Sequence, residues 1–407
     1  MDKIRSGFAD IVRESVLSPE EAPLKLKKGA KSISIGVPKA TRFQESRVSL
    51  KPDSVQVLVS SGLEVMVETN AGKLANFSDR DYSEAGARIV YDRKEVLSAE
   101  LILKVAPPSL EEIEMMKPGV VLISAFQTGE QSIEYLHALG KKKITAIGYE
   151  FIEDAVGGLP LVRAMSEIAG STVMLIAAEY LSSTGNGRGV ILGGITGVPP
   201  TNVVILGAGT VAEYAARAAL GLGADVKVYD NHIFKLRRLK HAIGQPVHTG
   251  TIENPSLERA LTHADVLIGA IRGEDGRNQC VVTEEMVSQM KPGSVIIDVS
   301  VDQGGCVETT RVTTHDRPTF RKYDVIHYCV PNIASRVAQT ATIAISNIVT
   351  PMVSRIAEEG GIDEMIFGHR WFMKGVYTYK GTLTNFNLAR KYNLGYKDLS
   401  LLMAARF

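Results

Sequence analysis

Cysteine is scarce in this sequence: the 407 residues include only Cys280, Cys306 and Cys329. They form no CxxC pair, and an odd number of cysteines in a large chain argues against a disulfide framework. Long hydrophobic runs are missing too, because no stretch approaches the roughly 18 apolar residues of a membrane span. Residues 1–32 mix charges throughout and lack the apolar core of a signal peptide. Together these absences predict a cytoplasmic protein in a reducing compartment.

A surplus of one charge is also missing, since 46 lysines and arginines face 45 aspartates and glutamates, for a net charge of +1. Neither a basic surface for nucleic acid nor an interaction tail of like charges is indicated. The sequence contains no HExxH motif, Cys/His cluster or GxSxG motif, which leaves metal and serine-hydrolase chemistry without support. Small molecules are therefore the predicted partners, with no nucleic acid, no membrane and no metal.

What the sequence does have is two series of apolar strands, each alternating with segments of helical spacing. The first series lies within residues 33–151 and includes "ISIGVP", "LEVMVET", "AELILKV", "GVVLISAF" and "ITAIGYEF". The second runs from Asn202 to Val330 and includes "NVVILGAG", "ADVKVYD", "ADVLIGAI", "SVIIDVS" and "DVIHYCV". Continuous apolar strands between helices are typical of parallel sheets that are covered on both faces. We therefore predict two doubly wound domains.

The second series opens with a glycine-rich turn in which Gly207, Gly209 and Ala212 form a GxGxxA pattern between a strand and a helix. The first glycine permits the tight turn, the second lets the backbone approach a pyrophosphate, and the small third residue allows close helix packing. Asp230 ends the next strand, 23 positions after Gly207, where an acid accepts hydrogen bonds from a ribose 2′-hydroxyl. Such an acid favours NAD over NADP, whereas Lys235 and two nearby arginines weaken that preference. A tight turn without a ligand is the structural alternative.

Two long helices are predicted to join the halves. Residues 165–183 suit a buried helix that crosses between domains, and residues 339–360 suit a second one that returns to the first domain. The second domain is then an insertion in the first. We predict an α/β fold with two Rossmann-like domains: an N-terminal extension at 1–31, a substrate domain at 32–160 and 340–407, and an inserted NAD-binding domain at 161–339.

Polar residues at the carboxyl ends of the predicted strands are the candidates for chemistry, because ligands of open α/β sheets bind there. In the first series these are Arg47, Lys104 and Gln127, and in the second they are Asp302 and Asn332. A guanidinium holds a carboxylate bidentately and an ammonium polarises a carbonyl oxygen, so Arg47 with Lys104 suits a keto or amino acid. Asp302 is a candidate base. Surface charges and structural ion pairs are the alternative explanation for each charged residue.

Several motifs resemble those of the alanine dehydrogenase family, which shares its architecture with the NAD-binding subunit of proton-translocating transhydrogenase. They include "SIGVPKATRFQESRVSLKP", "ILKVAPP", "AMSEIAGS", "VVILGAGTVAEYAAR" and "HYCVPNIASRVAQTAT", while "DQGGC" followed by "TTHDRPTF" favours the alanine dehydrogenase branch. The resemblance implies that Arg47 and Lys104 bind the keto acid, and that Asp302 works beside the nicotinamide of NAD. It also implies a homo-oligomer, in that family a homohexamer. The expected residues are Lys104, Gln127 and Asp302 for catalysis, Arg47 and Lys104 for substrate binding, and Ser166, Gly207, Gly209, Asp230, Lys235, Asp302 and Asn332 for cofactor binding.

The chain differs from this family at several positions that carry the catalytic residue or face the cofactor. Gln127 stands where the family has a catalytic histidine, and an amide cannot trade a proton near neutral pH. Ser171 replaces an arginine, Ile333 replaces a methionine near the nicotinamide, and a charged segment that begins at Arg272 replaces an apolar loop facing the cofactor. Gln127 can still donate a hydrogen bond to a carbonyl. We therefore expect it to orient the substrate without acid–base help, which is typically worth about 10²–10⁴-fold.

The function that these residues favour is an NAD-dependent dehydrogenase that interconverts L-alanine with pyruvate and ammonia. Two alternatives stay open. The first is a nucleotide-binding homologue without dehydrogenase activity, which Gln127, Ser171 and Arg272 motivate. The second is a dehydrogenase of another amino or imino acid, because the same substitutions can reshape the pocket. Retention of Arg47 and Lys104, together with the aspartate beside the cofactor, favours an active dehydrogenase.

Overall fold

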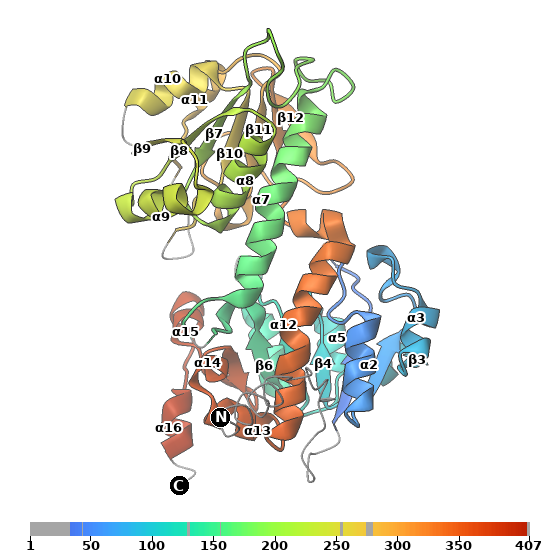
Figure 1. The fold of residues 1–407 in the computed structure, drawn as a ribbon. Coiled ribbons are helices and arrows are strands. Elements are labelled where there is room, and N and C mark those ends of the chain that lie inside the picture. The colour runs from blue at the N-terminus through green and yellow to red at the C-terminus, as the bar shows by residue number, and fades with distance from the viewer. Residues whose placement is uncertain are drawn as a thin grey trace, which may run out of the picture.

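The computed structural model describes residues 33–404 except 43, 128–130, 155, 253–254 and 274–279. These residues form two α/β domains, one above the other in Figure 1, which are joined by the long helices α7 (Pro160–Leu181) and α12 (Ala338–Glu358). The predicted N-terminal extension, 1–31, lies outside the described residues.

The first domain contains an eight-stranded sheet in the order β15-β14-β6-β5-β4-β1-β2-β3. Strands β1 to β6 are parallel, and β14 adds to the edge antiparallel to β6. The strands are β1 (Ser34–Val37), β2 (Glu64–Glu68), β3 (Arg88–Val90), β4 (Leu101–Leu103), β5 (Val121–Ser124), β6 (Thr145–Gly148), β14 (Val376–Tyr379) and β15 (Thr382–Leu383). The helices between the parallel strands are α2 (Pro52–Ser60), α3 (Asp79–Glu84), α4 (Arg93–Val96), α5 (Leu110–Met115) and α6 (Ile133–Lys141), and η1 (Lys73–Ala75) precedes α3.

The second domain contains a seven-stranded sheet in the order β12-β13-β11-β10-β7-β8-β9, in which β12 is the antiparallel edge strand. The chain starts at β7 and builds outward to either side, so the strand order reverses between β7 and β10, where ligands of such sheets bind. The strands are β7 (Asn202–Leu206), β8 (Asp225–Tyr229), β9 (His248–Gly250), β10 (Val266–Gly269), β11 (Val295–Asp298), β12 (Thr319–Lys322) and β13 (Val325–Tyr328). The helices are α8 (Thr210–Gly221), α9 (Ile233–Ile243), α10 (Pro255–His263) and α11 (Glu284–Ser288).

Both sheets are buried on both faces. Because successive side chains of a strand point to opposite faces, each strand contributes to two apolar cores. In β2, Val65 and Val67 lie in one core and Met66 in the other. In β7, Ile205 and Leu206 divide in the same way. This arrangement explains why the strands read as continuous apolar runs rather than as alternating patterns.

Helix α7 is long and apolar enough to cross a membrane by length and composition alone. It packs instead against α8 and α12, with less than half of its most apolar stretch buried. Its approach to α8 is close: a Cβ atom added at Gly170 would lie 2.4 Å from the carbonyl oxygen of Val211. We therefore interpret α7 as the core helix that was predicted to cross between the domains.

The chain returns to the first domain after the second is complete. Helix α12 descends into it, and the C-terminal residues add the hairpin β14–β15 together with α13 (Ile362–Gly368), α14 (Arg370–Met373), α15 (Phe386–Tyr392) and α16 (Leu399–Ala404). The predicted fold class, two doubly wound domains with the second inserted in the first, is confirmed. The domain boundaries given above stay a prediction.

Candidate active site where the two domains meet

The carboxyl ends of three parallel strands bring Arg47, Lys104 and Gln127 to one edge of the first sheet. Lys104 follows β4, Gln127 follows β5, and the loop after β1 carries Arg47. The backbone N–H of Lys104 donates to the carbonyl of Ile123 on β5 at 3.0 Å, so the ends of β4 and β5 lie side by side. Glu150 follows β6, the next strand in the sheet.

Arg47 is held by a buried carboxylate. Its Nε and Nη2 donate to the two carboxylate oxygens of Glu45, each at 2.7 Å, and the side chain of Glu45 is 0% exposed. Burial alone would raise the pKa of Glu45, but the charge and hydrogen bonds of Arg47, with a smaller contribution from Asn332, lower the pKa below its ordinary value. The bidentate edge of the guanidinium is thus occupied by Glu45. Its Nη1 faces the sulfur of Met165 on α7 at 3.2 Å.

Lys104 is held in a similar way. Its Nζ lies 2.8 Å from each carboxylate oxygen of Glu112 on α5, and the lysine is only 3% exposed. Burial lowers the pKa of Lys104, and the charge of Glu112 opposes that shift. Glu112 also accepts the backbone N–H of Ser109 at 2.8 Å and contacts Arg93 at 3.4 Å, which in turn pairs with Glu68 at 2.9 Å. Lys104 therefore belongs to a chain of alternating charges.

Gln127 lies on a turn whose backbone is hydrogen-bonded to the side chain of Glu150. The backbone N–H groups of Phe126 and Gln127 donate to the Glu150 carboxylate at 2.9 Å and 2.8 Å. Gln127 has a positive φ of 55°, an uncommon conformation for a residue other than glycine. Its side-chain Oε1 is buried and, among the described residues, has no hydrogen-bond partner. Burial raises the pKa of Glu150, and the backbone N–H groups of Glu150, Phe126 and Gln127, with the charge of Arg272, only partly offset this.

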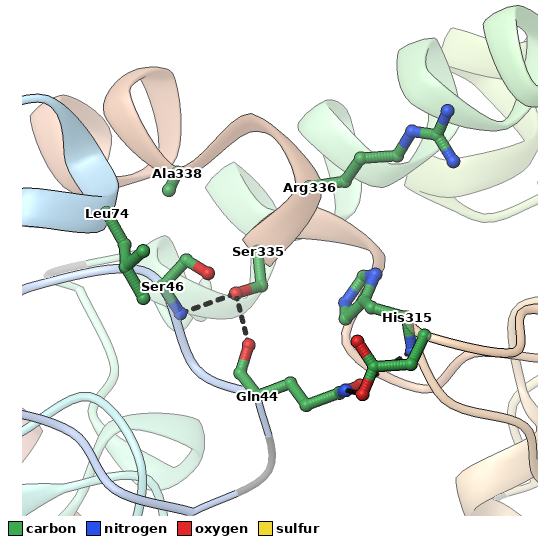
Figure 2. Close-up of a pocket in the computed structure, with 8 residues that line it drawn as sticks. Gln44, Ser46, Leu74, His315, Ser335, Arg336 and Ala338 are labelled. Atoms are coloured by element: carbon green, nitrogen blue, oxygen red, sulfur yellow. Dashed lines mark hydrogen bonds between the residues drawn. The ribbon is translucent and has the colours of Figure 1, made fainter.

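The second domain contacts this edge through the segment after β13. The Nδ2 of Asn332 donates to Glu45 at 3.2 Å, and the hydroxyl of Ser335 accepts the backbone N–H of Ser46 at 2.7 Å. Figure 2 shows this junction and the contact of Gln44, whose Oε1 accepts the backbone N–H of His315 at 2.6 Å. The carboxyl edges of the two sheets therefore meet at the loop that carries Arg47. An open cavity of about 520 Å³ lies there, lined by Gln44, Ser46, Leu74, His315, Asp316, Ser335, Arg336 and Ala338.

Asp302 lies in the short helix η3 (Val301–Gln303) and is exposed. The loop around it is anchored by Asp298, which is fully buried at the end of β11. The carboxylate of Asp298 accepts the backbone N–H groups of Ser300 and Cys306, each at 3.0 Å, and the hydroxyl of Thr310 at 3.0 Å. Asp298 thus fixes the loop on which Asp302 is presented.

The glycine-rich turn has the conformation that its sequence predicts. Gly207 has a φ of +98°, and a Cβ atom there would lie 2.5 Å from the carbonyl oxygen of Ala270. Gly209 precedes α8 as its N-cap without a capping side chain, and a Cβ atom there would meet nothing within 4 Å. Ala212 is fully buried where α8 packs on the sheet. The space before α8 is therefore open to a ligand, and a helix N-terminus favours a phosphate there.

Asp230 lies directly beside this turn. Its Oδ2 accepts the backbone N–H of Ala208 at 2.8 Å, and its Oδ1 accepts that of His232 at 2.7 Å. The Nδ1 of His232 also lies 3.0 Å from Oδ1, so of the roughly four acceptor positions of the carboxylate about one remains for a ribose hydroxyl. Arg238 donates to the carbonyl of Ala208 at 3.0 Å, and Lys235 lies in the first turn of α9. The residues present therefore fit a dinucleotide.

Ser166 lies on α7 immediately after Met165, the residue that contacts Arg47. Its hydroxyl donates to the carbonyl of Val162 at 2.8 Å. Apart from Asp302 in η3, the sequence-predicted residues thus gather in two groups, one at the edge of the first sheet and the other around the glycine-rich turn. Asn332 and Ser166 lie between the domains.

Sequence reasoning missed three carboxylates of this site. Glu45 stands two positions before Arg47, and Glu112 occupies the N3 position of a capping box whose N-cap is Ser109. Glu150 follows a buried strand, the same signal that selected Gln127. Each of the three binds a residue at the sheet edge, so together they set the electrostatics of the site.

Comparison with known proteins agrees with this architecture. The models for "Alanine dehydrogenase/PNT", N-terminal and C-terminal domains, match residues 36–169 and 173–386. The chain is 39% identical over 369 residues to alanine dehydrogenase 2 of Staphylococcus aureus strain USA300, which covers 90% of this chain and 98% of that protein. A solved structure of an L-alanine dehydrogenase aligns with a TM-score of 0.84 and 38% identity, over 89% of this chain and 99% of that one. A transhydrogenase structure from Sinorhizobium meliloti, with a TM-score of 0.74 and 22% identity over 87% of this chain and 99% of that one, shares the fold.

Proposed function

Because the chain belongs to the alanine dehydrogenase/PNT family, we propose that it is an NAD-dependent amino-acid dehydrogenase that converts L-alanine, NAD and water into pyruvate, ammonia and NADH. The observation that carries this proposal is the pair of cations, Arg47 and Lys104, each ion-paired with a buried carboxylate at the edge where the two domains meet. Such a pair suits the carboxylate and carbonyl oxygens of a 2-oxo acid. The family resemblance further leads us to propose a cytoplasmic homo-oligomer, a hexamer by analogy.

NAD would be held by the open turn at Gly209, with the Asp230 carboxylate beside its adenosine ribose. Ser166, Lys235 and Asn332 are the further proposed cofactor contacts. When bound, the nicotinamide accepts a hydride from the substrate Cα. Asp302 is proposed to balance charge and assist proton movement beside it. The Asp298 anchor supports this role, because it fixes the loop that presents Asp302.

The substrate would be oriented by donors and acceptors at the sheet edge. The Nη1 of Arg47 faces only a weak acceptor, the sulfur of Met165, so it is the part of the guanidinium best placed to bind the substrate carboxylate. Lys104 has three N–H donors, and the two oxygens of Glu112 accept at most two of them. Gln127 offers the buried acceptor Oε1, which suits an N–H of the substrate amino group.

The experiment that tests this function is NADH formation, followed by near-ultraviolet absorbance. Purified protein would be mixed with NAD and a panel of L-amino acids that includes alanine, across a range of pH. Turnover that is fastest with alanine is the expected result. Turnover with another amino or imino acid would change the substrate assignment. Tight NADH binding without turnover on the whole panel would favour a nucleotide-binding homologue that has lost its activity.

The nucleotide site can be tested separately through Gly209→Val. We expect this substitution to weaken NADH binding at least about tenfold, because the side chain would enter the open space where the pyrophosphate approaches the turn. The melting temperature should change little, since no atom lies within 4 Å of the new Cβ. NADH fluorescence titration and thermal unfolding measure the two effects.

Gly221→Val is the matched control for this prediction. Gly221 is the last residue of the same helix, α8, and its Cβ position is equally open. Its replacement should leave NADH affinity unchanged. Equal affinities of the wild-type protein and Gly209→Val would contradict the placement of the nucleotide at this turn.

A further inference from the structure

Oxidation of an amino acid to a 2-oxo acid needs a group that accepts a proton from the attacking water. Loss of a hydride from Cα leaves an iminium carbon, and water adds to that carbon as one of its protons departs. The Gln127 side chain is an amide and cannot accept this proton near neutral pH. If the proposed function holds, another group at the same sheet edge must take it.

We propose that Glu150 is this proton acceptor and that Gln127 only orients the substrate. Glu150 follows β6, which is adjacent to the strand that leads to Gln127. Its Oε1 lies 2.8 Å from the backbone nitrogen of Gln127. The Glu150 carboxylate is therefore next to position 127, where an acid–base residue is expected. The inference rests on the proposed function and adds a residue to it.

The glycine that ends β6 leaves room for the ring of Phe151, which packs beside the carboxylate of Glu150. Gly148 ends β6, and a Cβ atom added there would lie 3.4 Å from Oε2 of Glu150 and 2.6 Å from the ring of Phe151. Two N–H donors, from Phe126 and Gln127, then hold the carboxylate across the ends of β5 and β6. A carboxylate that accepts backbone N–H bonds in this way is fixed in place and, with about four acceptor positions, keeps capacity for a water.

The surroundings of Glu150 suit proton transfer. The aromatic side chains of Phe126, Tyr135, Phe151 and Tyr377 contact one another beside it, and burial in this apolar environment raises the pKa of the carboxyl above its ordinary value. The charged and titratable groups whose electrostatic effects involve Glu150 are Arg272 in the loop after β10, Tyr135 on α6 and Tyr377 on β14. A base works best when its pKa approaches the working pH.

Every proton can be accounted for in the conversion of the amino acid to the 2-oxo acid. The substrate enters the step as the amine, and its Cα–H bond breaks with both electrons leaving as hydride, so that an iminium forms. The water oxygen then bonds to Cα while its proton passes to the Glu150 carboxylate. The proton is next returned to the nitrogen, the C–N bond breaks, and ammonia departs. The remaining hydroxyl proton is released to Glu150 and then to solvent as the C=O bond of the 2-oxo acid forms.

The decisive experiment compares kcat as a function of pH for the wild-type protein, Glu150→Gln, Gln127→His and the double variant. In the wild-type protein, kcat should fall at acidic pH as Glu150 becomes protonated. Glu150→Gln keeps an oxygen that accepts the two backbone N–H groups, so NADH affinity and melting temperature should hold. Its kcat should fall by about 10²–10⁴-fold, and the acidic limb should disappear. An imidazole introduced by Gln127→His should then restore a large part of the turnover in the Glu150→Gln background.

Glu153→Gln serves as the matched control, because Glu153 lies three residues away and pairs with Lys374 at 2.7 Å. It should retain the wild-type profile. Turnover and an acidic limb that persist in Glu150→Gln would overturn the role of Glu150 and leave the proposed function intact. Lost NADH affinity and stability in Glu150→Gln without rescue by Gln127→His would also overturn it, in favour of a structural role. A wild-type protein that oxidises no amino acid would overturn both proposals.

Discussion

Replacing Arg47 with methionine is expected to remove nearly all amino-acid turnover and to destabilise the protein. The Glu45 carboxylate, with 0% of its side chain exposed, would lose both hydrogen bonds of 2.7 Å to the guanidinium. Removing one partner of a buried ion pair costs about 3–5 kcal/mol. Losing a charged contact to the substrate costs about 2–5 kcal/mol, roughly 30- to 4,000-fold in kcat/KM. Thermal unfolding and steady-state kinetics with L-alanine measure these two effects.

The double variant Arg47→Met/Glu45→Gln separates stability from activity. A neutral amide at position 45 is no longer a stranded buried charge, so most of the lost stability should return. Activity should not return, because the cation that binds the substrate carboxylate is still missing. If the double variant recovered turnover, Arg47 would act only by neutralising Glu45. An unchanged kcat/KM in Arg47→Met would contradict its place in the substrate site.

The sequence predicted the central strands of both sheets because buried parallel strands consist largely of apolar residues. Strands β5 (VLIS) and β11 (VIID) each contain three consecutive apolar residues, and each follows a Met-Lys-Pro-Gly turn. The strands that it missed, β3, β9, β12, β14 and β15, have two to four residues and lie at or next to a sheet edge. An edge strand need not carry the continuous apolar run of a buried parallel strand, as β9 (HTG) and β12 (TFRK) show. The pairing of β14 with β6 depends on where α12 returns the chain.

Site residues could be predicted where they directly follow a strand. Their hydrogen-bond and ion-pair partners, which come from other parts of the chain, could not. Arg47, Lys104 and Gln127 follow strands, so the strand-end rule selected them. Their carboxylate partners are set by tertiary contact, as Glu112 on α5 shows. Glu150 was missed for a local reason: the apolar run was predicted to continue through residue 151, whereas β6 ends at residue 148. The roles of all these residues stay predictions.

Lys104→Met is expected to reduce activity as strongly as the arginine replacement but to destabilise the protein less. After the loss of Lys104, Glu112 would keep Arg93 at 3.4 Å and the backbone N–H of Ser109 at 2.8 Å. We therefore expect a cost near the lower end of the range for a broken buried pair, about 3 kcal/mol. Glu45 has no such second cation among the described ion pairs. Thermal unfolding of the two single variants should rank them in this order.

The role of Lys104 in the substrate site should also appear in the pH dependence of KM. Burial lowers the pKa of Lys104 from 10.5, with Glu112 opposing the shift, so its ammonium loses a proton at a lower pH than an ordinary lysine. The neutral amine binds an anionic substrate less well. The KM for pyruvate, measured with saturating NADH and ammonia, should therefore rise with pH in the wild-type protein before pH 10.5 is reached. In Lys104→Met the KM should be high at all pH values and should lack this rise. A KM equal to that of the wild-type protein, with the same rise, would remove Lys104 from the substrate site, because no other change in the variant could supply the missing charge.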